Sequence, residues 1–226
     1  MAISVVIPAL NEEQAIASVV ENVPGQMVQE VIVVDNGSTD NTALQAAAAG
    51  ARVVHESRRG YGAACHAGAL AARQADIIVF LDGDYSDDPR YLPLLVEPLS
   101  RNQADLAVAS RLHGGLEKGS MLWHGRLGNL LVAWLIRRLY SVDLTDLGSF
   151  RAIRSETLFD LGMEQMTYGW PVEMVVKAAQ KGWRLKSVPV PYRRRLGTSK
   201  VSGTVKGSLL AAYYMFFVPL LYLWKR

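Results

Sequence analysis

Two aspartates separated by a single glycine, Asp82 and Asp84, are the residues whose types and spacing point most directly to chemistry. They follow the apolar run 77–81, Ile-Ile-Val-Phe-Leu, which is typical of a strand buried on both faces. Open α/β sheets bind ligands at the carboxyl ends of their strands, so the pair lies where a ligand is expected. Carboxylates suit Mg²⁺ or Mn²⁺, which proteins usually hold with one or two such groups and the phosphates of a substrate. Taken alone, the motif is equally compatible with a strand that ends in a plain turn.

The elements that must position these carboxylates form four strand–helix units within the first 85 residues. The expected elements are a strand at 4–8 that Pro8 ends, a helix that Asn11 caps, a strand at 31–34, a helix at about 42–49 capped from 38–41, a strand at 52–55, a helix that runs to Arg73, and the strand at 77–81. This alternation predicts an α/β fold with a mostly parallel central sheet flanked by helices. A further strand is expected at 106–110.

The order of the strand-end motifs resembles family 2 glycosyltransferases with the GT-A fold. The motifs are Val6-Ile-Pro-Ala-Leu-Asn11-Glu12, Val34-Asp35-Asn-Gly-Ser-Thr-Asp40, Arg59-Gly-Tyr-Gly62 and Phe80-Leu-Asp82-Gly-Asp84. Later segments are similar to the polyprenyl-phosphate (dolichyl-phosphate) sugar synthases, namely Ser110-Arg111, Asp146-Leu-Gly-Ser-Phe-Arg151, Gly169-Trp-Pro-Val-Glu173-Met and Arg195-Leu-Gly-Thr-Ser199-Lys200. The resemblance covers nearly the whole chain.

The resemblance implies a donor site for a nucleoside diphosphate sugar, such as a UDP- or GDP-sugar, with Mg²⁺ or Mn²⁺ as cofactor. Its implied residues are Pro8, Asn11 and Glu12 around the nucleotide, Asp35 on the base or ribose, Arg59 and Gly62 near the phosphates, Asp84 as the main metal ligand and Asp82 as a direct or water-mediated one. Two positions depart from the family pattern. Asn36 replaces a second aspartate, and Ser86 stands where a stronger ligand can occur.

The resemblance also implies an acceptor site that holds a phosphate. Its implied residues are Arg111 and Arg126 on the phosphate, Ser110 and Arg151 in the same pocket, and Arg195, Ser199 and Lys200 on a mobile loop that closes over both substrates. Glu173 is expected to be either a general base for a hydroxyl acceptor or an orienting and capping residue. A phosphate acceptor is already anionic and needs no strong base. Asp87 and Asp88 are interpreted as N-terminal charges of a helix near 90–100.

Composition predicts an ordinary globular enzyme, and the distribution of charge favours a lipid partner. The chain has 226 residues, 50% of them hydrophobic, which predicts one domain with a sizeable core. A single cysteine, Cys65, fits a reducing compartment, and the sequence shows no signal peptide. After Glu173 there are 11 basic and no acidic residues, although the whole chain has a net charge of only +3. That tail ends in an apolar run, which favours anionic lipid or a lipid phosphate over nucleic acid as its partner.

Two apolar segments are candidates for contact with a membrane. Residues 208–224 contain no charge, and residues 123–140 have one broad apolar face followed by Arg137 and Arg138. We expect both to lie in the membrane–water interface; a single membrane span, or packing on the sheet or in a homodimer, are the alternatives. The expected division is a GT-A domain at 1–206, with a donor half at about 1–110 and an acceptor half at about 111–206, and an apolar segment at 207–226.

The sequence therefore predicts a metal-dependent, inverting glycosyltransferase that acts on a polyprenyl phosphate at the cytoplasmic face of the membrane. The alternative within this class is a hydroxyl acceptor, such as a sugar or phosphoglycerate, with Glu173 as base. A sugar-1-phosphate nucleotidyltransferase is less favoured, because those enzymes usually carry a glycine-rich loop after the first strand, and residues 8–12 contain no glycine.

Overall fold

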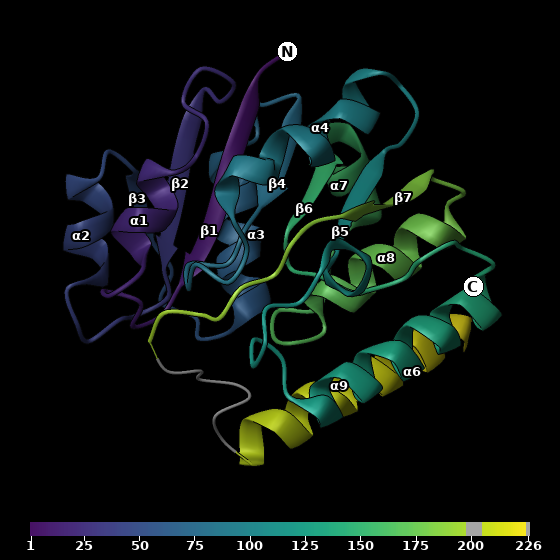
Figure 1. The fold of residues 1–226 in the computed structure, drawn as a ribbon. Helices are drawn as coiled ribbons and strands as arrows, with labels where there is room; N and C mark the ends of the chain where they lie inside the picture. The colour runs from purple at the N-terminus through teal and green to yellow at the C-terminus, as the bar shows by residue number, and fades with distance from the viewer. Residues whose placement is uncertain (198–204, 225–226) are drawn as a thin grey trace.

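A seven-stranded sheet forms the centre of the computed structural model, which describes residues 1–197 and 205–224 (Figure 1). The strands are β1 (Ile3–Ala9), β2 (Glu30–Asp35), β3 (Arg52–His55), β4 (Ile77–Phe80), β5 (Leu106–Ser110), β6 (Arg151–Arg154) and β7 (Leu185–Pro189). Their order across the sheet is β3-β2-β1-β4-β6-β5-β7. All neighbouring pairs are parallel except the two that β6 makes, with β4 and with β5. The predicted α/β fold with a mostly parallel sheet is confirmed.

Helices cover both faces of this sheet (Figure 1). They are α1 (Ile16–Glu21), α2 (Thr42–Ala48), α3 (Tyr61–Ala71), a 3₁₀ turn at Pro89–Tyr91 that leads into α4 (Leu92–Ser100), α5 (Arg111–Gly114), α6 (Trp123–Tyr140), α7 (Ser155–Leu161), α8 (Trp170–Gln180) and α9 (Val205–Trp224). Alternate side chains of β1 divide the core: Val5 and Ile7 pack with α1 and α4, whereas Val6 packs with α3 and α8. The central strands β1, β4, β5 and β6 are therefore buried on both sides, as their apolar residues predict, whereas β3 and β7 at the edges of the sheet are partly exposed.

Pro8 lies inside β1 and does not end it, contrary to the expectation from the sequence. The carbonyl of Val6 accepts a hydrogen bond from the amide of Leu81, so the even-numbered residues of β1 point their backbone groups toward β4. The pairing with β4 stops at Val6 opposite Phe80. The missing N–H of Pro8 therefore faces a place where the ladder has already ended, and β1 continues to Ala9 at no cost in hydrogen bonds.

Asn11 does not cap the first helix, which begins only at Ile16. Its backbone φ is +53°, and its Oδ1 accepts a hydrogen bond from the amide of Thr39 at 2.8 Å. The amide of Asn11 in turn donates to Ser38 Oγ at 3.0 Å. Asn11 thus joins the loop after β1 to the loop after β2, and so fixes the two strand ends beside each other.

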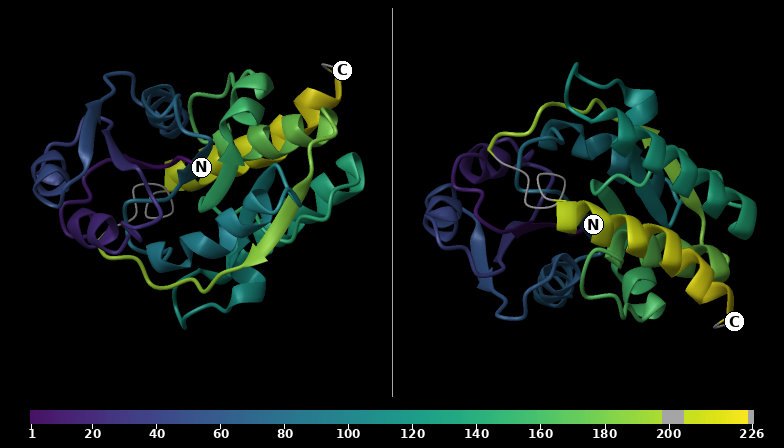
Figure 2. Two further views of the ribbon diagram at one scale, coloured as in Figure 1. Left: turned by 90° about the horizontal axis from the view of Figure 1, so that it is seen from above. Right: turned by 90° about the horizontal axis from the view of Figure 1, so that it is seen from below.

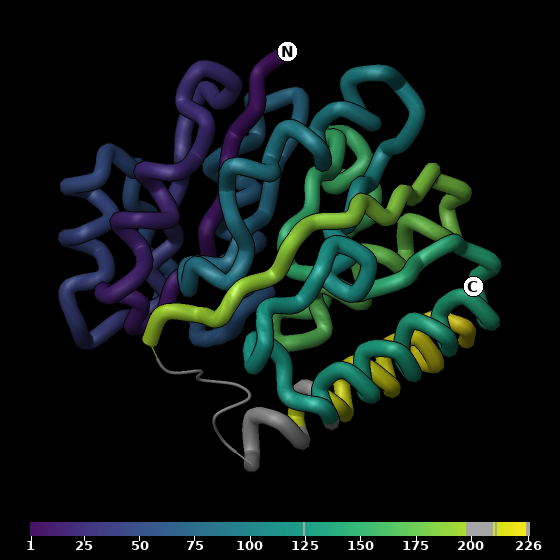
Figure 3. The backbone as a smooth tube through the Cα atoms, viewed as in Figure 1, coloured from purple at the N-terminus to yellow at the C-terminus, as the bar shows by residue number. Residues whose placement is uncertain are grey.

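The segment after β7 crosses the carboxyl edge of the sheet and pairs with the loop that carries the two aspartates (Figure 3). The amide of Arg193 donates to the carbonyl of Ser86, and the amide of Leu196 donates to the carbonyl of Asp84, both at 2.9 Å. Asp88 also forms an ion pair with Arg193. Residues about 110 positions apart in the chain are therefore held together at the strand ends.

Helices α6 and α9 lie side by side at the same end of the molecule as the carboxyl edge of β1 (Figures 1 and 2). The hydroxyl of Tyr140 donates to the carbonyl of Pro219 and links their C-terminal ends. Their outer sides form an exposed apolar face of Trp123, Leu127, Leu130, Leu131, Trp134, Leu210, Tyr213, Phe216, Phe217, Leu220 and Trp224. Among the described residues, no helix has the length and apolar character needed to cross a bilayer.

Candidate functional site

A pocket of about 390 Å³ lies at the carboxyl ends of β1 and β4. Its walls include residues that sequence analysis assigned to the donor site, together with one assigned to the acceptor loop: Pro8, Glu12, Arg59, Asp82, Asp84 and Arg195. They come from segments up to 187 positions apart, and the parallel strand ends and the crossing segment bring them together. Their meeting in one cavity is the geometry that a strand-end ligand site requires.

Asp84 is buried and firmly oriented by its neighbour Ser86. The amide and the hydroxyl of Ser86 both donate to Asp84 Oδ1, at 2.9 and 2.5 Å. Oδ2 lies 3.0 Å from Nη1 of Arg195. Sequence analysis considered Ser86 as a weak metal ligand, but its hydroxyl donates a hydrogen bond that fixes the orientation of the Asp84 side chain.

Asp82 accepts a hydrogen bond from the hydroxyl of Tyr61 at 3.0 Å. Burial, and next the negative charge of Asp84, raise the pKa of Asp82. A divalent cation between the two carboxylates would relieve both effects, so this donor set fits Mg²⁺ or Mn²⁺. The described residues contain no cluster of three or more metal-ligating side chains, and a pair of carboxylates is the kind of site that substrate phosphates complete.

Arg195 bridges the two sides of the pocket. Its Nη2 donates to Glu12 Oε1 at 2.8 Å while its Nη1 contacts Asp84. Sequence analysis placed this arginine on the acceptor loop, and the structure places its charge on donor-side carboxylates. The other two residues assigned to that loop, Ser199 and Lys200, lie outside the described residues.

Asn36 is a residue whose role sequence analysis left open. Its Nδ2 donates to the carbonyls of Glu56 and Arg58, both at 2.9 Å, and its Oδ1 accepts from the amide of Gly60 at 2.8 Å. Its own carbonyl accepts from Arg59 Nη1 at 3.1 Å. Asn36 therefore shapes the turn that brings Arg59 to the pocket, work that an aspartate could not do because it lacks the two N–H donors.

Asp35 lies at the end of β2, beside the pocket, as its strand-end position predicts. Its carboxylate accepts from the amide of Ser38 at 2.9 Å and lies 3.2 Å from Nδ1 of His55. Burial alone would raise the pKa of Asp35, but the bonds from Ser38 and His55 lower it overall. The carboxylate is thus kept ionised as a hydrogen-bond acceptor.

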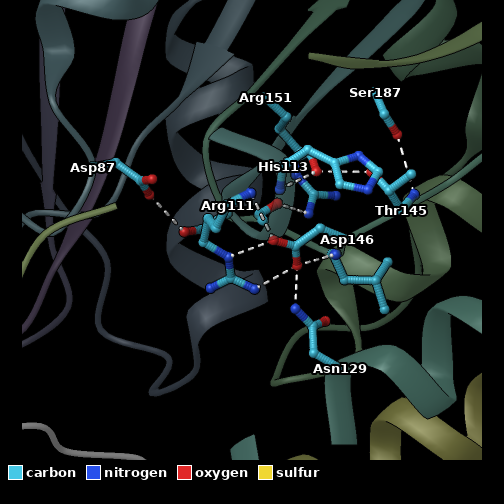
Figure 4. Close-up of polar contacts among 12 residues, drawn as sticks. Asp87, Arg111, His113, Asn129, Thr145, Asp146, Arg151 and Ser187 are labelled. Carbon is cyan, nitrogen blue, oxygen red and sulfur yellow. Dashed lines mark hydrogen bonds and ion pairs between the residues drawn. The ribbon is translucent and has the colours of Figure 1, made fainter. Parts of the chain in front are cut away.

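Several residues expected on the acceptor side are held by partners within the protein. Arg111 is committed to Asp146: Nε donates to Oδ2 at 3.0 Å and Nη2 donates to Oδ1 at 2.8 Å (Figure 4). The Asp146 side chain is fully buried and also accepts from Asn129 and from the amide of Leu147. Arg126 lies on the first turn of α6 with its side chain exposed.

Ser110 and Arg151, which were also expected on the acceptor side, have hydrogen-bond partners within the protein. Ser110 caps α5 by accepting from the amide of His113, and its hydroxyl also accepts from Thr145 at 2.8 Å. Arg151 is 1% exposed, and its guanidinium donates to the carbonyls of Pro171 and Gly148. Both side chains therefore make hydrogen bonds to other residues of the protein interior.

Glu173 is fully buried, and its carboxylate lies outside the pocket walls. It accepts hydrogen bonds from the amides of Glu164 and Gln165, at 2.9 and 2.7 Å, and from the hydroxyl of Tyr222 at 2.6 Å. Lys177 Nζ lies 2.9 Å away as an ion-pair partner. These four partners hold the carboxylate in place, which fits the orienting role that sequence analysis gave as one of two alternatives.

Asp87 and Asp88 differ in role, although sequence analysis treated them alike. Asp88 caps the 3₁₀ turn by accepting from the amide of Arg90, as expected. Asp87 is fully buried; Ser149 donates to its Oδ2 at 3.2 Å, while its Oδ1 has no hydrogen-bond partner among the described residues. Burial, only partly offset by the charge of Arg111, raises the pKa of Asp87 to about 8.

We expect Asp87→Asn to alter the pH dependence of stability. An unfolded aspartate has a pKa of about 3.9. The folded wild type therefore holds a proton between about pH 4 and pH 8 that the unfolded chain has released, and its stability falls as pH rises through this range. Asp87→Asn carries no such cost, so its melting temperature relative to wild type should rise from pH 5 to pH 8. Calorimetry in chelator would measure this, and a constant difference would contradict the buried, protonated state.

Comparison with known proteins agrees with the geometry. The model of the family Glycosyl transferase family 2 matches residues 4–160. An uncharacterized glycosyltransferase of Mycobacterium tuberculosis is 41% identical over 212 residues, 93% of this chain and 94% of the relative. The dolichyl-phosphate hexose transferase of Haloferax volcanii is 33% identical over 213 residues, 92% of this chain and 90% of the relative.

A solved structure supports the same fold. Glucosyl-3-phosphoglycerate synthase from Mycobacterium tuberculosis, in complex with Mn²⁺, UDP and glucosyl-3-phosphoglycerate, matches with a TM-score of 0.76 and 28% identity. The match covers 97% of this chain and 78% of that chain. The names of the dolichyl-phosphate hexose transferase and of glucosyl-3-phosphoglycerate synthase state different acceptors.

Proposed function

The chain belongs to glycosyl transferase family 2, and we propose that it moves a sugar from a nucleoside diphosphate sugar to a polyprenyl phosphate at a membrane surface. The observation that carries the acceptor is the exposed apolar face of α6 and α9, at the same end of the molecule as the carboxyl edge of β1, where residues of the pocket lie. Arg126 at its start and Arg137 and Arg138 at its far end are exposed cations on α6. An apolar surface bracketed by arginines suits a lipid layer with anionic headgroups.

The donor is proposed to bind along the carboxyl ends of β1 and β4. Asp35 would accept from the nucleoside, as would the pocket-lining Glu12 once Arg195 moves, and Arg59 would face the diphosphate. Asp82 and Asp84 would hold Mg²⁺ or Mn²⁺, which when bound neutralises charge on the diphosphate leaving group. Ser86 and Tyr61 keep the two carboxylates in place.

The transfer itself is proposed as one in-line displacement. A phosphate oxygen of the acceptor attacks the anomeric carbon and forms the new C–O bond. The bond from that carbon to the diphosphate breaks on the opposite face, and its electron pair stays on the diphosphate oxygen. The configuration at the anomeric carbon is thereby inverted, and the protein contributes position and charge.

A phosphate acceptor also agrees with the state of Glu173. A hydroxyl acceptor would profit from a general base, whereas the carboxylate that sequence analysis offered for this role is buried and held by four partners. The acceptor phosphate is proposed to meet Arg126 together with Arg195 and Lys200. Residues 1–206 would carry the reaction, and 207–226 would belong to the membrane contact.

A second candidate is transfer to the hydroxyl of a small phosphorylated acid. The similarity to glucosyl-3-phosphoglycerate synthase, at a TM-score of 0.76, favours it. One experiment separates the two: purified protein is incubated with radiolabelled UDP- or GDP-sugars and Mn²⁺, with either a polyprenyl phosphate in vesicles or 3-phosphoglycerate. Label in the lipid phase supports our proposal. Label only in the water-soluble product overturns it.

We predict that a charge on the apolar face releases the protein from vesicles. Trp134→Glu and Phe217→Glu replace exposed side chains, so neither disturbs the core. Burial of one large apolar side chain is worth about 1.5–3 kcal/mol, so each change should weaken binding to anionic vesicles at least about tenfold. Leu44→Glu on α2, also at an exposed leucine, is the matched control. The membrane contact would be contradicted if both variants co-sediment with vesicles as wild type does and instead dissociate a homodimer.

A further inference from the structure

Tyr222 fastens α9 to the body of the protein at three points. Its hydroxyl donates to Glu173 Oε1 at 2.6 Å, and its carbonyl accepts from Gln180 Nε2 at 2.5 Å. Lys177 Nζ lies 5.1 Å from the centre of its ring. Tyr222 is itself 2% exposed, whereas its neighbours Leu220 and Trp224 are exposed on the apolar face. The residue is thus the inner anchor of a helix whose outer side is apolar.

Glu173 connects Tyr222 to the segment before α8. Its two oxygens accept from the amides of Glu164 and Gln165, so the position of the carboxylate decides where that backbone lies. Tyr222 and Lys177 hold the carboxylate from the other side. A carboxylate that is fully buried is costly unless it is paired, so these four contacts act as one unit.

The segment 164–168 is in turn locked to the wall of the donor pocket. The amide of Gly62 donates to the carbonyl of Thr167 at 3.2 Å, and the amide of Ala63 donates to the carbonyl of Met166 at 2.8 Å. A Cβ on Gly62 would lie 2.2 Å from the carbonyl oxygen of Gln165, which shows how closely the two backbones approach. Thr167 and Tyr168 line the pocket beside Tyr61, the residue that holds Asp82.

We propose that Tyr222 is a positioning residue for the donor pocket, acting through Glu173 and the segment 164–168. The contacts form an unbroken series from α9 to the pocket wall, and each link is a hydrogen bond or a close backbone contact. The part of this proposal that concerns a nucleotide ligand rests on the proposed function. The part that concerns the segment 164–168 does not.

The first test measures the segment directly. Tyr222→Phe removes only the hydroxyl, and hydrogen exchange of the amides of Glu164 and Gln165 should become faster by about three- to tenfold. Tyr214→Phe, a half-buried tyrosine of the same helix, is the matched control and should leave these amides unchanged. Equal protection of the two amides in wild type and Tyr222→Phe would overturn the proposal, whatever ligand the pocket takes.

The second test measures the pocket. With UDP and Mn²⁺ as probes in calorimetry, Tyr222→Phe should raise Kd by about three- to tenfold, while Tyr214→Phe should not. Glu173→Gln should act in the same direction, and the double variant should cost less than the sum of the single changes, because both act through one series of contacts. A lower melting temperature with unchanged Kd would show a purely structural role and overturn the proposal. If wild type binds neither UDP nor GDP, the proposed function fails, and the exchange measurement still decides the role of Tyr222.

Discussion

Asp84→Asn is expected to abolish sugar transfer while the fold remains intact. The substitution keeps the size of the side chain, and its amide oxygen can still accept from the amide and hydroxyl of Ser86. It removes one negative charge from the pair that is proposed to hold the divalent cation. Charge stabilisation of this kind is worth several kcal/mol, so a loss of about 4 kcal/mol would lower kcat about a thousandfold.

The measurement is turnover at saturating donor over a range of Mn²⁺ concentrations, with thermal melting as a check of the fold. Asp143→Asn, an exposed aspartate away from the pocket, is the control and should keep full activity. Tyr61→Phe frees Asp82 of its hydrogen bond without removing a charge, and should therefore cost far less than Asp84→Asn. Turnover near the wild-type rate in Asp84→Asn at saturating Mn²⁺ would falsify the metal assignment.

Sequence predicted that Pro8, Glu12, Arg59, Asp82 and Asp84 lie together, and the structure places all five in one pocket. The strand 77–81 places Asp82 and Asp84 at the sheet edge through local pattern alone, and parallel pairing with β1 then brings Pro8 and Glu12 to the same edge. Such positions depend on the fold class and the register. The fold class and the register both follow from apolar runs that can be recognised in the sequence.

The ion-pair partners of the arginines expected on the acceptor side could not be predicted, because the sequence offers several acidic residues for each of them. Arg111 follows a strand, like Asp82, but its guanidinium pairs with Asp146, 35 positions away. Arg195 likewise contacts Glu12, at the other end of the chain. The sequence shows that a charged residue is present, whereas only the folded structure shows with which oppositely charged residue it forms an ion pair.

Glu173 is another residue whose contacts the sequence does not show. A glutamate in the first turn of a helix is compatible with a base, a cap or an anchor. What decides its role is burial together with Tyr222, which lies 49 positions later in a segment that the sequence analysis assigned to the membrane surface. The inner side of α9 packs against the protein and its outer side is exposed, and an uncharged run gives no periodic signal that distinguishes the two sides.

Arg111→Ala is expected to destabilise the protein strongly, where a phosphate-binding arginine at a surface would affect only the acceptor. The side chain of Asp146 is fully buried, and Arg111 supplies its opposite charge through two hydrogen bonds (Figure 4). The centre of the Tyr192 ring lies 5.1 Å from the guanidinium carbon. Removal of one partner of a buried pair costs about 3–5 kcal/mol, since the other charge stays behind. Chemical denaturation would measure this loss.

A double-mutant cycle with Asp146→Asn tests the cause of that loss. In the Asp146→Asn background, Arg111→Ala leaves no unpaired Asp146 carboxylate behind, so it should cost at least about 2 kcal/mol less than in wild type. The pH gives an independent check. Burial alone would raise the pKa of Asp146, but Arg111 and the hydrogen bonds lower it overall. The stabilisation is therefore fully present above the unfolded pKa of about 3.9 and lost as pH falls through the folded pKa. The difference between wild type and Arg111→Ala should then shrink in acid. If Arg111→Ala is as stable as wild type at neutral pH and raises only the acceptor concentration for half-maximal rate, the arginine binds the acceptor phosphate, and the buried pair is not its purpose.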